Sequence, residues 1–213
     1  MTAIKNKSTF SNSSLIIDDT LVVSDLHIGY PREKRAVNSM EKRLQKLIDS
    51  HNCQELVLNG DVFHDFPFYE HGISMFKNIK QQHNITIEYV VGNHEEKIGG
   101  VKQADVPFAT TVQNEYLFSN DSNTINICHG HETPTNPADV FIIGHVHPQV
   151  KQNGILQPCV LYKEDAYHNS DVIILPSFGG LSSQNEYTTI PTSHAPILND
   201  GSNITEYSVL QTF

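Results

Sequence analysis

Clusters of histidine, aspartate and asparagine recur along this chain, and each directly follows a short apolar run. In chain order they are Asp25-Leu26-His27, Gly60-Asp61, Gly92-Asn93-His94-Glu95, His129-Gly130-His131 and Gly144-His145-Val146-His147. Imidazole nitrogens combined with carboxylate and amide oxygens, without thiolate, favour Mn, Fe, Zn, Ni or Co over Ca or Mg. A carboxylate has two oxygens and can bridge two cations, and we predict that Asp61 does so. The clusters therefore predict a binuclear metal site.

The apolar runs before the clusters are predicted to be buried strands. They cover residues 21–23, 56–58, 85–91, 124–128 and 140–143. In α/β proteins, ligands bind where the carboxyl ends of the strands meet at the mouth of the sheet. In an extended segment the two side chains of Asp-x-His or His-x-His point to the same face, because the strand period is two. We therefore expect five strand ends to bring their polar side chains to one point.

We expect one α/β domain over residues 14–213, preceded by a polar, flexible tail over residues 1–13. The length of 213 residues suits a single domain with a substantial core. Two segments, 35–50 and 68–81, carry apolar residues at spacings of three and four, which predict amphipathic helices. Residues 182–203 are polar and contain two prolines, so they are predicted to form a long loop, whose role stays open.

Further strands account for most of the remaining pattern. A hairpin is expected where two β-rich runs flank Asp18-Asp19-Thr20. The other strands are predicted over 116–118, 155–162, 172–175 and 204–210. The stretch between Glu96 and Asn120 otherwise shows no regular pattern.

Composition limits the classes of partner. The formal net charge is −10 with neutral histidines, and no run of lysine and arginine stands out. Sequence-independent binding of nucleic acid draws mainly on positive charge, so an extended duplex is disfavoured as a partner. The three scattered cysteines do not form the pattern of a disulfide framework or a structural zinc site, and Cys128 and Cys159, which lie beside apolar residues, are predicted to be core residues. Nothing approaches the ~18 consecutive apolar residues of a membrane span, and the first ten residues lack the apolar core of a secretory signal. We expect a cytoplasmic protein without a membrane partner, whose oligomeric state stays open, with a homodimer as one option.

The ordered series of clusters resembles the signature of the calcineurin-like metallophosphoesterases. The resemblance spans residues 25–147 and includes all five clusters. Within that superfamily the flanking residues look most like the ICC-like branch, which includes the DNA-ligase-associated phosphoesterases. The residues that carry this likeness are Ser24 to Gly29, Gly60 to His64, Gly144 to Pro148 and Ile174 to Gly179. The resemblance implies a four-layer αββα sandwich of two mixed β-sheets flanked by helices, with the site at one edge.

The resemblance also implies a ligand set. The first cation would be held by Asp25, His27, Asp61 and His147, and the second by Asp61, Asn93, His129 and His145. His94 would lie near the scissile phosphate without binding a metal. Both cations are expected to be manganese, with iron, nickel, cobalt or zinc as alternatives. The chain departs from the family at His64, where many members carry a second aspartate, and this leaves the orientation of His94 open.

Three residues near the clusters keep alternative roles. His131 could replace His129 as a ligand, or it could contact the substrate. His64 is expected to contact a ligand rather than to be one. Glu95 could orient a neighbouring residue or simply face the solvent.

The function we predict is phosphodiester hydrolysis, with a hydroxide that bridges the two cations as the nucleophile. His94 would stabilise the transition state or protonate the leaving oxygen. The partner is a phosphoester substrate, with nucleotide-derived compounds as candidates. Alternatives are a nuclease acting on single-stranded or damaged nucleic acid ends, a phosphomonoesterase, and a non-catalytic scaffold on the same fold. A nuclease would need a basic or aromatic groove that the sequence does not reveal, and a scaffold would lack ligands that are all present here.

Overall fold

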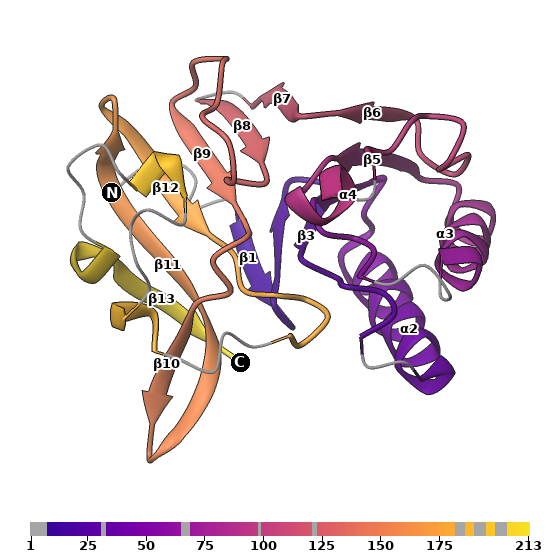
Figure 1. The fold of residues 1–213 in the computed structure, drawn as a ribbon, viewed down its shortest axis with the longest axis horizontal. Helices are drawn as coiled ribbons and strands as arrows, with labels where there is room; N and C mark the ends of the chain where they lie inside the picture. Colours follow the sequence, from indigo (N-terminus) through magenta and orange to yellow (C-terminus); the bar gives the residue numbers. More distant parts are fainter. Residues whose placement is uncertain are drawn as a thin grey trace.

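The computed structural model describes residues 8–30, 33–64, 69–97, 99–120, 123–181, 186–189, 195–198 and 204–213. In these ranges the chain forms two β-sheets, with helices packed against the first of them (Figure 1). The first sheet has six strands in the order β1-β2-β3-β4-β5-β6. They are β1 (Ser8–Ser11), β2 (Ser14–Ile17), β3 (Thr20–Ser24), β4 (Glu55–Asn59), β5 (Thr86–Val90) and β6 (Thr111–Gln113). Because β3 to β6 are parallel neighbours, their carboxyl ends lie along one edge.

The second sheet of the described chain has seven strands. The order is β10-β11-β12-β9-β8-β7, and β13 also pairs with β11. The strands are β7 (Glu115–Ser119), β8 (Thr124–Cys128), β9 (Val140–Ile143), β10 (Gln149–Gln152), β11 (Ile155–Tyr167), β12 (Ser170–Ile174) and β13 (Ser208–Thr212). The central strands β8, β9 and β12 run parallel, and the outer strands are antiparallel. The carboxyl ends of β8 and β9 therefore share one edge of this sheet.

Both faces of the central strands are buried, which explains their continuous apolar runs. In β4, Leu56 and Leu58 pack with residues of the helices, while Val57 packs with residues of the second sheet. In β9, Val140 and Ile142 belong to the same inter-sheet core. This alternation follows the period of two in a strand, and it packs the two sheets face to face.

Two long helices cover the first sheet, and Figure 1 shows them side by side at its outer flank. They are α2 (Lys34–His51) and α3 (Tyr69–His83). The buried residues of α2 are Val37, Met40, Leu44, Leu47 and Ile48. Their spacing of three and four is the pattern from which the helix over 35–50 is predicted, and both helix predictions are confirmed. A third, short helix, α4 (Asn93–Lys97), follows β5.

The predicted fold class, a sandwich of two mixed sheets flanked by helices, is confirmed. The outer face of the second sheet differs in detail from the predicted layer of helices. In the described residues it is covered by the 3₁₀ turns η4 (Pro196–Leu198) and η5 (Ile204–Glu206), whose apolar side chains pack on that sheet. The turn η2 (Tyr187–Thr189) also packs there. Pro196 lacks a backbone N–H and is tolerated only at the start of a helix, which fits a short turn.

The predicted tail over residues 1–13 is wrong from Ser8 onward, and residues 1–7 lie outside the described ranges. Residues Ser8–Ser11 form β1, which pairs antiparallel with β2. Phe10 packs against the core between the sheets. The packing of Phe10 and the β-propensity of Thr9 therefore favour a strand at this edge of the sheet in spite of the polar composition of residues 8–11.

The hairpin β2–β3 and the strands β4, β5, β7, β8, β9, β11 and β12 confirm predicted elements. The last predicted strand starts later than expected, at Ser208, because residues 204–206 form a 3₁₀ turn. Strands β6 and β10 and helix α4 were not predicted. β6 has only three residues and β10 reads Gln-Val-Lys-Gln, so neither carries an apolar pattern. Most of the predicted loop over 182–203 lies outside the described residues.

The three cysteines, Cys53, Cys128 and Cys159, are buried and free, which confirms the prediction of core residues for Cys128 and Cys159. Burial raises the pKa of the Cys53 thiol to about 11, which keeps it protonated and unreactive. None of the helices in the described part of the chain is long and apolar enough to cross a membrane.

Candidate metal centre

The loops that follow β3 and β4 are bonded to each other and carry three predicted ligands. The N–H of Asp25 donates to the Gly60 carbonyl at 3.1 Å, and the N–H of His27 donates to the Asp61 carbonyl at 2.9 Å. The prediction that Asp25 and His27 share the face of an extended segment is wrong, because their φ angles are +55° and +46°. Left-handed backbone curls this loop, and its bonds to the next loop hold the curl in place.

The same backbone conformation recurs at other predicted ligands. The φ angles of His145, His147 and Asp61 are +62°, +47° and +48°, so the His-x-His segment is not extended either. Among non-glycine residues, Asp, Asn and His adopt positive φ most readily. Unfavourable backbone of this kind persists where the surroundings over-determine it, and it concentrates at functional sites.

Two glycines allow the sheets to approach each other at this edge. A Cβ at Gly60 would collide with the His129 ring, and a Cβ at Gly144 would collide with Ser24 and Asp25. Gly60 and Asp25 follow strands of the first sheet, while Gly144 and His129 follow strands of the second. The missing side chains therefore let the two sets of ligand-type residues meet.

One group of ligand-type atoms comprises Asp25, His27 and His147, which lie within 4.8 Å of one another. His147 Nε2 is 2.9 Å from Asp25 Oδ1. His27 Nε2 is 3.2 Å from His147 Nε2 and 4.0 Å from Asp25 Oδ1. The N–H of His145 also donates to Asp25 Oδ2 at 3.0 Å, so the carboxylate is held from both sheets.

A second group comprises Asp61, His129 and His145, again within 4.8 Å. His129 Nε2 lies 3.4 Å from Asp61 Oδ1 and 3.2 Å from Asn93 Oδ1. The other ring nitrogen of His129 lies 3.2 Å from the Asn59 carbonyl. A proton on Nδ1 can bond that carbonyl, and this tautomer leaves Nε2 as an electron-pair donor.

Asp61 lies between the two groups. Its Oδ1 faces His129, while its Oδ2 is 3.9 Å from His27 Nε2. The N–H of His94 donates to Oδ1 at 2.9 Å, which fixes the orientation of the carboxylate. Each oxygen of Asp61 therefore points toward a different histidine.

The electrostatics keep both carboxylates ionised in spite of burial. Burial opposes ionisation, but the imidazoles of His147 and His129 lower the pKa of Asp25 well below its usual range. Hydrogen bonding to His129 likewise lowers the pKa of Asp61 to about 2. In return, and against the effect of burial, these carboxylates raise the pKa of His129 to about 9. Such a centre attracts positive charge, which a proton or a metal cation can supply.

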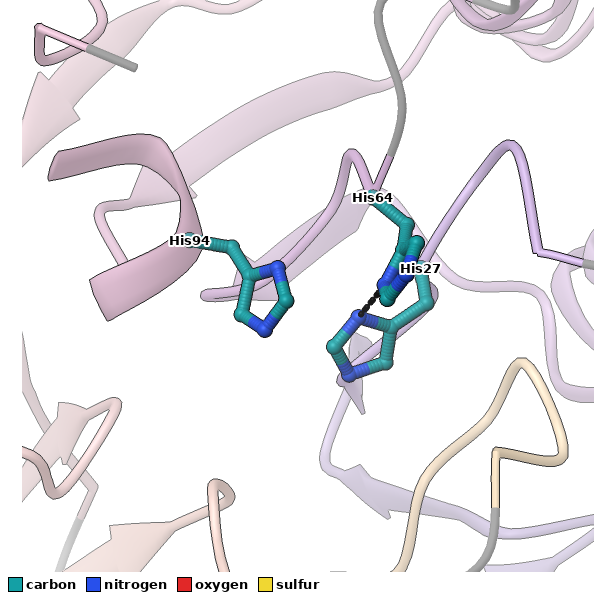
Figure 2. Close-up of side chains that lie close together, drawn as sticks. All are labelled: His27, His64 and His94. Atoms are coloured by element: carbon teal, nitrogen blue, oxygen red, sulfur yellow. Dashed lines mark hydrogen bonds between the residues drawn. The ribbon is translucent and has the colours of Figure 1, made fainter. Parts of the chain in front are cut away.

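His94 and His64 lie beside the first group, as Figure 2 shows for the three imidazoles of His27, His64 and His94. His64 Nδ1 is 3.2 Å from His27 Nδ1, so His64 contacts a predicted ligand. His94 Nε2 is 3.9 Å from Asp61 Oδ2, and its ring centre is 5.0 Å from those of His27 and His64. Burial lowers the pKa of His94 below its ordinary value, which favours the neutral imidazole at pH 7.

The two histidines of His129-Gly130-His131 have different surroundings. His129 lies among Asp61 and Asn93, as described above. His131 is directed to another acid, with its Nε2 3.2 Å from Glu96 Oε1, and its ring centre is 5.2 Å from that of His129. This placement favours His129 over His131 as a ligand and leaves His131 at the rim.

Glu95 is fully buried, so the alternative in which it faces the solvent is wrong. Its Oε2 accepts the N–H groups of Asp61 and Gly92 at 3.0 and 2.9 Å, and its Oε1 accepts those of Val62 and Phe63 at 2.7 and 3.1 Å. The Tyr89 hydroxyl donates to Oε1 at 3.1 Å. Burial and the Asp61 charge raise the pKa of Glu95, and the N–H donors oppose that shift. One carboxylate therefore holds the loop that carries Asp61.

Replacing Glu95 with glutamine is expected to destabilise this loop. An amide has one acceptor oxygen, so its NH₂ group would face backbone N–H donors and leave them unsatisfied, at about 1–3 kcal/mol. Residues that orient metal ligands typically contribute ~10–100-fold to metal affinity. We expect losses of this size in urea unfolding and in Mn²⁺ titration calorimetry. Tyr89→Phe removes one donor to Glu95 and leaves both carboxylate oxygens free to accept the four backbone N–H groups, so it is the matched control. Wild-type stability and Mn²⁺ affinity in Glu95→Gln would contradict this role.

Three residues that the sequence reasoning missed also hold the centre. The Ser24 hydroxyl donates to Asp25 Oδ2 at 2.6 Å, Asn59 offers its carbonyl to His129, and Tyr89 donates to Glu95. Ser24 and Asn59 are the last residues of β3 and β4, directly before the clusters. Their polarity at the end of an apolar strand was the available signal.

Comparisons with known proteins give one family match and similarities to solved structures. A family model described as calcineurin-like phosphoesterase matches residues 19–204. The crystal structure of the Pseudomonas putida nuclease MPE aligns with a TM-score of 0.62 at 21% identity, over 82% of each chain. A hypothetical protein from Pyrococcus horikoshii OT3, PH1004, aligns with a TM-score of 0.45 at 10% identity, over 74% of this chain and 76% of that one. No curated protein matches the sequence.

The family model supports a conclusion about family membership, whereas structural similarity at 21% identity shows only that the fold is shared. The model spans most of the chain, from the β2–β3 turn to η5, and includes every cluster described above. The narrower branch within the family stays a prediction. From the extent of this match we conclude that the chain belongs to the calcineurin-like phosphoesterase family and is a metal-dependent hydrolase of phosphoric esters.

Proposed function

We propose that this hydrolase is a phosphodiesterase with a binuclear metal centre. The observation that carries the proposal is the placement of Asp61, whose two oxygens face His129 on one side and His27 on the other. A carboxylate between two sets of imidazoles suits a pair of cations that share one ligand. A single cation would leave either Asp25, His27 and His147 or Asp61, His129 and His145 without a role. Two other groups of ligand-type atoms in the described residues, His27–His64–His94 and Glu96–His131–Glu132, lie outside the proposed pair.

The residues present fit such a pair. The first cation would be held by Asp25, His27, Asp61 and His147, and the second by Asp61, Asn93, His129 and His145. The donors are imidazole nitrogens with carboxylate and amide oxygens, which suit Mn, Fe, Co, Ni or Zn; manganese is our first choice. Bound there, the cations would supply Lewis-acid polarisation of the phosphate and an activated water.

The protein's own contribution is to fix the substrate and to donate hydrogen bonds. His94 belongs to neither ligand set, and it reaches the space beside Asp61 from α4. A neutral imidazole carries one N–H donor. We assign to this N–H of His94 a hydrogen bond to a phosphoryl oxygen; the alternative role, proton transfer to the leaving oxygen with a contribution of ~10²–10⁴-fold, would require the imidazolium form.

The proposed centre attracts anionic phosphoesters. Two dications beside the buried carboxylates of Asp25 and Asp61 would leave the site net positive, and the field in a cleft is local in spite of the formal charge of −10 on the whole chain. A diester, which carries one charge, and a monoester, which carries about −1.5 to −2 at pH 7, both suit such a site. We propose the diester, and the substrate comparison below decides between the two.

A nuclease is the second candidate function. Its support is the fold shared with the Pseudomonas putida protein, which is described as a nuclease. The same chemistry would then act on the phosphodiester bonds of an unpaired strand. The acidity of this chain argues against an extended duplex as substrate.

A matrix of metals and substrates tests the proposal. Metal-stripped protein would be reloaded with Mn²⁺, Fe²⁺, Co²⁺, Ni²⁺ or Zn²⁺ and assayed on an aryl phosphodiester, an aryl phosphomonoester, cyclic nucleotides and single-stranded oligonucleotides. We expect the highest kcat/KM for a diester with Mn²⁺. A higher kcat/KM for the monoester would contradict the diester assignment, and release of nucleotides from the ends of the oligonucleotide would favour the nuclease.

A further inference from the structure

We propose that Tyr30, backed by His64, forms a stacking subsite for a nucleobase carried by the phosphoester substrate. This inference rests on the proposed function, and it narrows the substrate class to nucleotide-derived esters with an unpaired base. Tyr30 and His64 together form an aromatic surface that the sequence alone did not reveal.

Tyr30 is an unusual exposed ring. Among the described residues the exposed large hydrophobic side chains are Tyr30, Leu117 and Ile155, at 49%, 40% and 65% exposure. Leu117 lies on β7 and Ile155 begins β11, at the β10–β11 turn. Tyr30 is the aromatic residue of the three, and its ring contacts His64 beside the proposed metal centre.

The contacts of Tyr30 lead from the solvent into that centre. Its ring centre is 5.2 Å from that of His64, with the planes tilted by 53°. The His64 ring in turn lies 5.0 Å from His94 and 5.3 Å from His27. A group esterified to a phosphate beside Asp61 would therefore extend toward the solvent along the rings of His94, His64 and Tyr30.

Backbone hydrogen bonds hold the loop that carries Tyr30. The Tyr30 N–H donates to the His27 carbonyl at 2.9 Å. Ile28 forms a β-bridge with Phe63, and the His64 N–H donates to the Ile28 carbonyl at 2.9 Å. Because these bonds hold the loop of Tyr30 against the loop of His64, little backbone ordering is needed when a ligand stacks on the ring.

A nucleobase is the ligand that this surface fits. Every base has a π-face, and stacking on an aromatic side chain is a common way in which proteins hold unpaired nucleotides. Bases inside a duplex are already stacked and cannot reach such a ring without being flipped out. The sequence is acidic and has no run of lysine and arginine that would track a long backbone, so we infer recognition of one base beside the reacting phosphate.

Calorimetry with two small phosphates tests the subsite. Mn²⁺-loaded protein would be titrated with thymidine 5′-monophosphate and with 2-deoxyribose 5-phosphate, which share sugar and phosphate and differ by the base. We expect the wild-type protein to bind the nucleotide about 10-fold more tightly, and Tyr30→Ala to lose that preference, in line with the usual effect of removing a stacking partner. Binding of the sugar phosphate should stay unchanged in Tyr30→Ala.

Two control variants make the result specific. Tyr30→Phe keeps the ring and should keep the preference; if it behaves like Tyr30→Ala, the hydroxyl is the contact and stacking is wrong. Ile155→Ala removes a more exposed apolar side chain from the β10–β11 turn and should change nothing. Equal wild-type affinities for the two phosphates, or a preference that survives in Tyr30→Ala, would overturn the subsite. Diester hydrolysis by the same samples reports on the proposed function separately, because Tyr30 is not a metal ligand.

Discussion

Replacing Asp61 with asparagine is expected to remove both cations and to abolish hydrolysis. The variant keeps one oxygen but loses the charge and the ability to face His129 and His27 with equivalent oxygens. We expect kcat/KM for a diester to fall by more than the ~10²–10³-fold that loss of one transition-state donor costs. Metal content by mass spectrometry should fall well below that of the wild type.

Asparagine is chosen because Asp61 has a φ of +48°. Asparagine tolerates left-handed backbone, whereas alanine there would add strain of roughly 1–2 kcal/mol and confuse lost metal with lost fold. Asp18→Asn is the matched control, since Asp18 is exposed in the β2–β3 turn and has a φ of +52°. Wild-type metal content in Asp61→Asn would show that Asp61 is not shared by two cations.

Replacing His94 with alanine is expected to keep the metals and to lose rate. His94 lies outside both proposed ligand sets, and its backbone N–H can still donate to Asp61 Oδ1 in the variant. We expect kcat to fall by ~10²–10⁴-fold, the usual contribution of a positioned proton donor. His71→Ala, on the exposed side of α3, is the control for loss of a histidine.

Leaving groups separate the two roles open to His94. If it protonates the leaving oxygen, His94→Ala should lose far more rate on an alkyl ester than on a p-nitrophenyl ester, because p-nitrophenolate leaves without a proton. If it donates to a non-bridging phosphoryl oxygen, both esters should lose rate equally. Loss of metal from His94→Ala would contradict its place outside the ligand sets.

Local pattern was sufficient for the elements that position the centre. The apolar spacing in α2 matches its five buried residues, and the runs before the clusters are strands because burial on both faces requires continuous apolar sequence. The loops between them were harder to predict. Left-handed φ at Asp25 and His27 depends on bonds to Gly60 and Asp61 in the next loop, and no local pattern encodes a bond between segments so far apart in the chain.

The roles of individual side chains likewise depend on neighbours that are distant in the sequence, so local pattern does not predict them. His129 and His131 are alike in sequence, and it is the neighbouring Asn93 and Glu96 that separate them. Glu95 could have faced solvent, and its burial follows from four backbone N–H groups supplied partly by the loop after β4. Tyr30 gave no signal in the sequence because exposure beside His64 is a property of the folded loops.

The most direct test of the shared-carboxylate centre is the stoichiometry and magnetic coupling of bound manganese. Protein reloaded with Mn²⁺ would be measured by mass spectrometry for metal per chain and by electron paramagnetic resonance for interaction between the ions. We predict two ions per chain with the signal of a spin-coupled pair, and loss of that signal in Asp61→Asn. One ion per chain, or two ions that give independent signals, would contradict a centre in which Asp61 joins two cations.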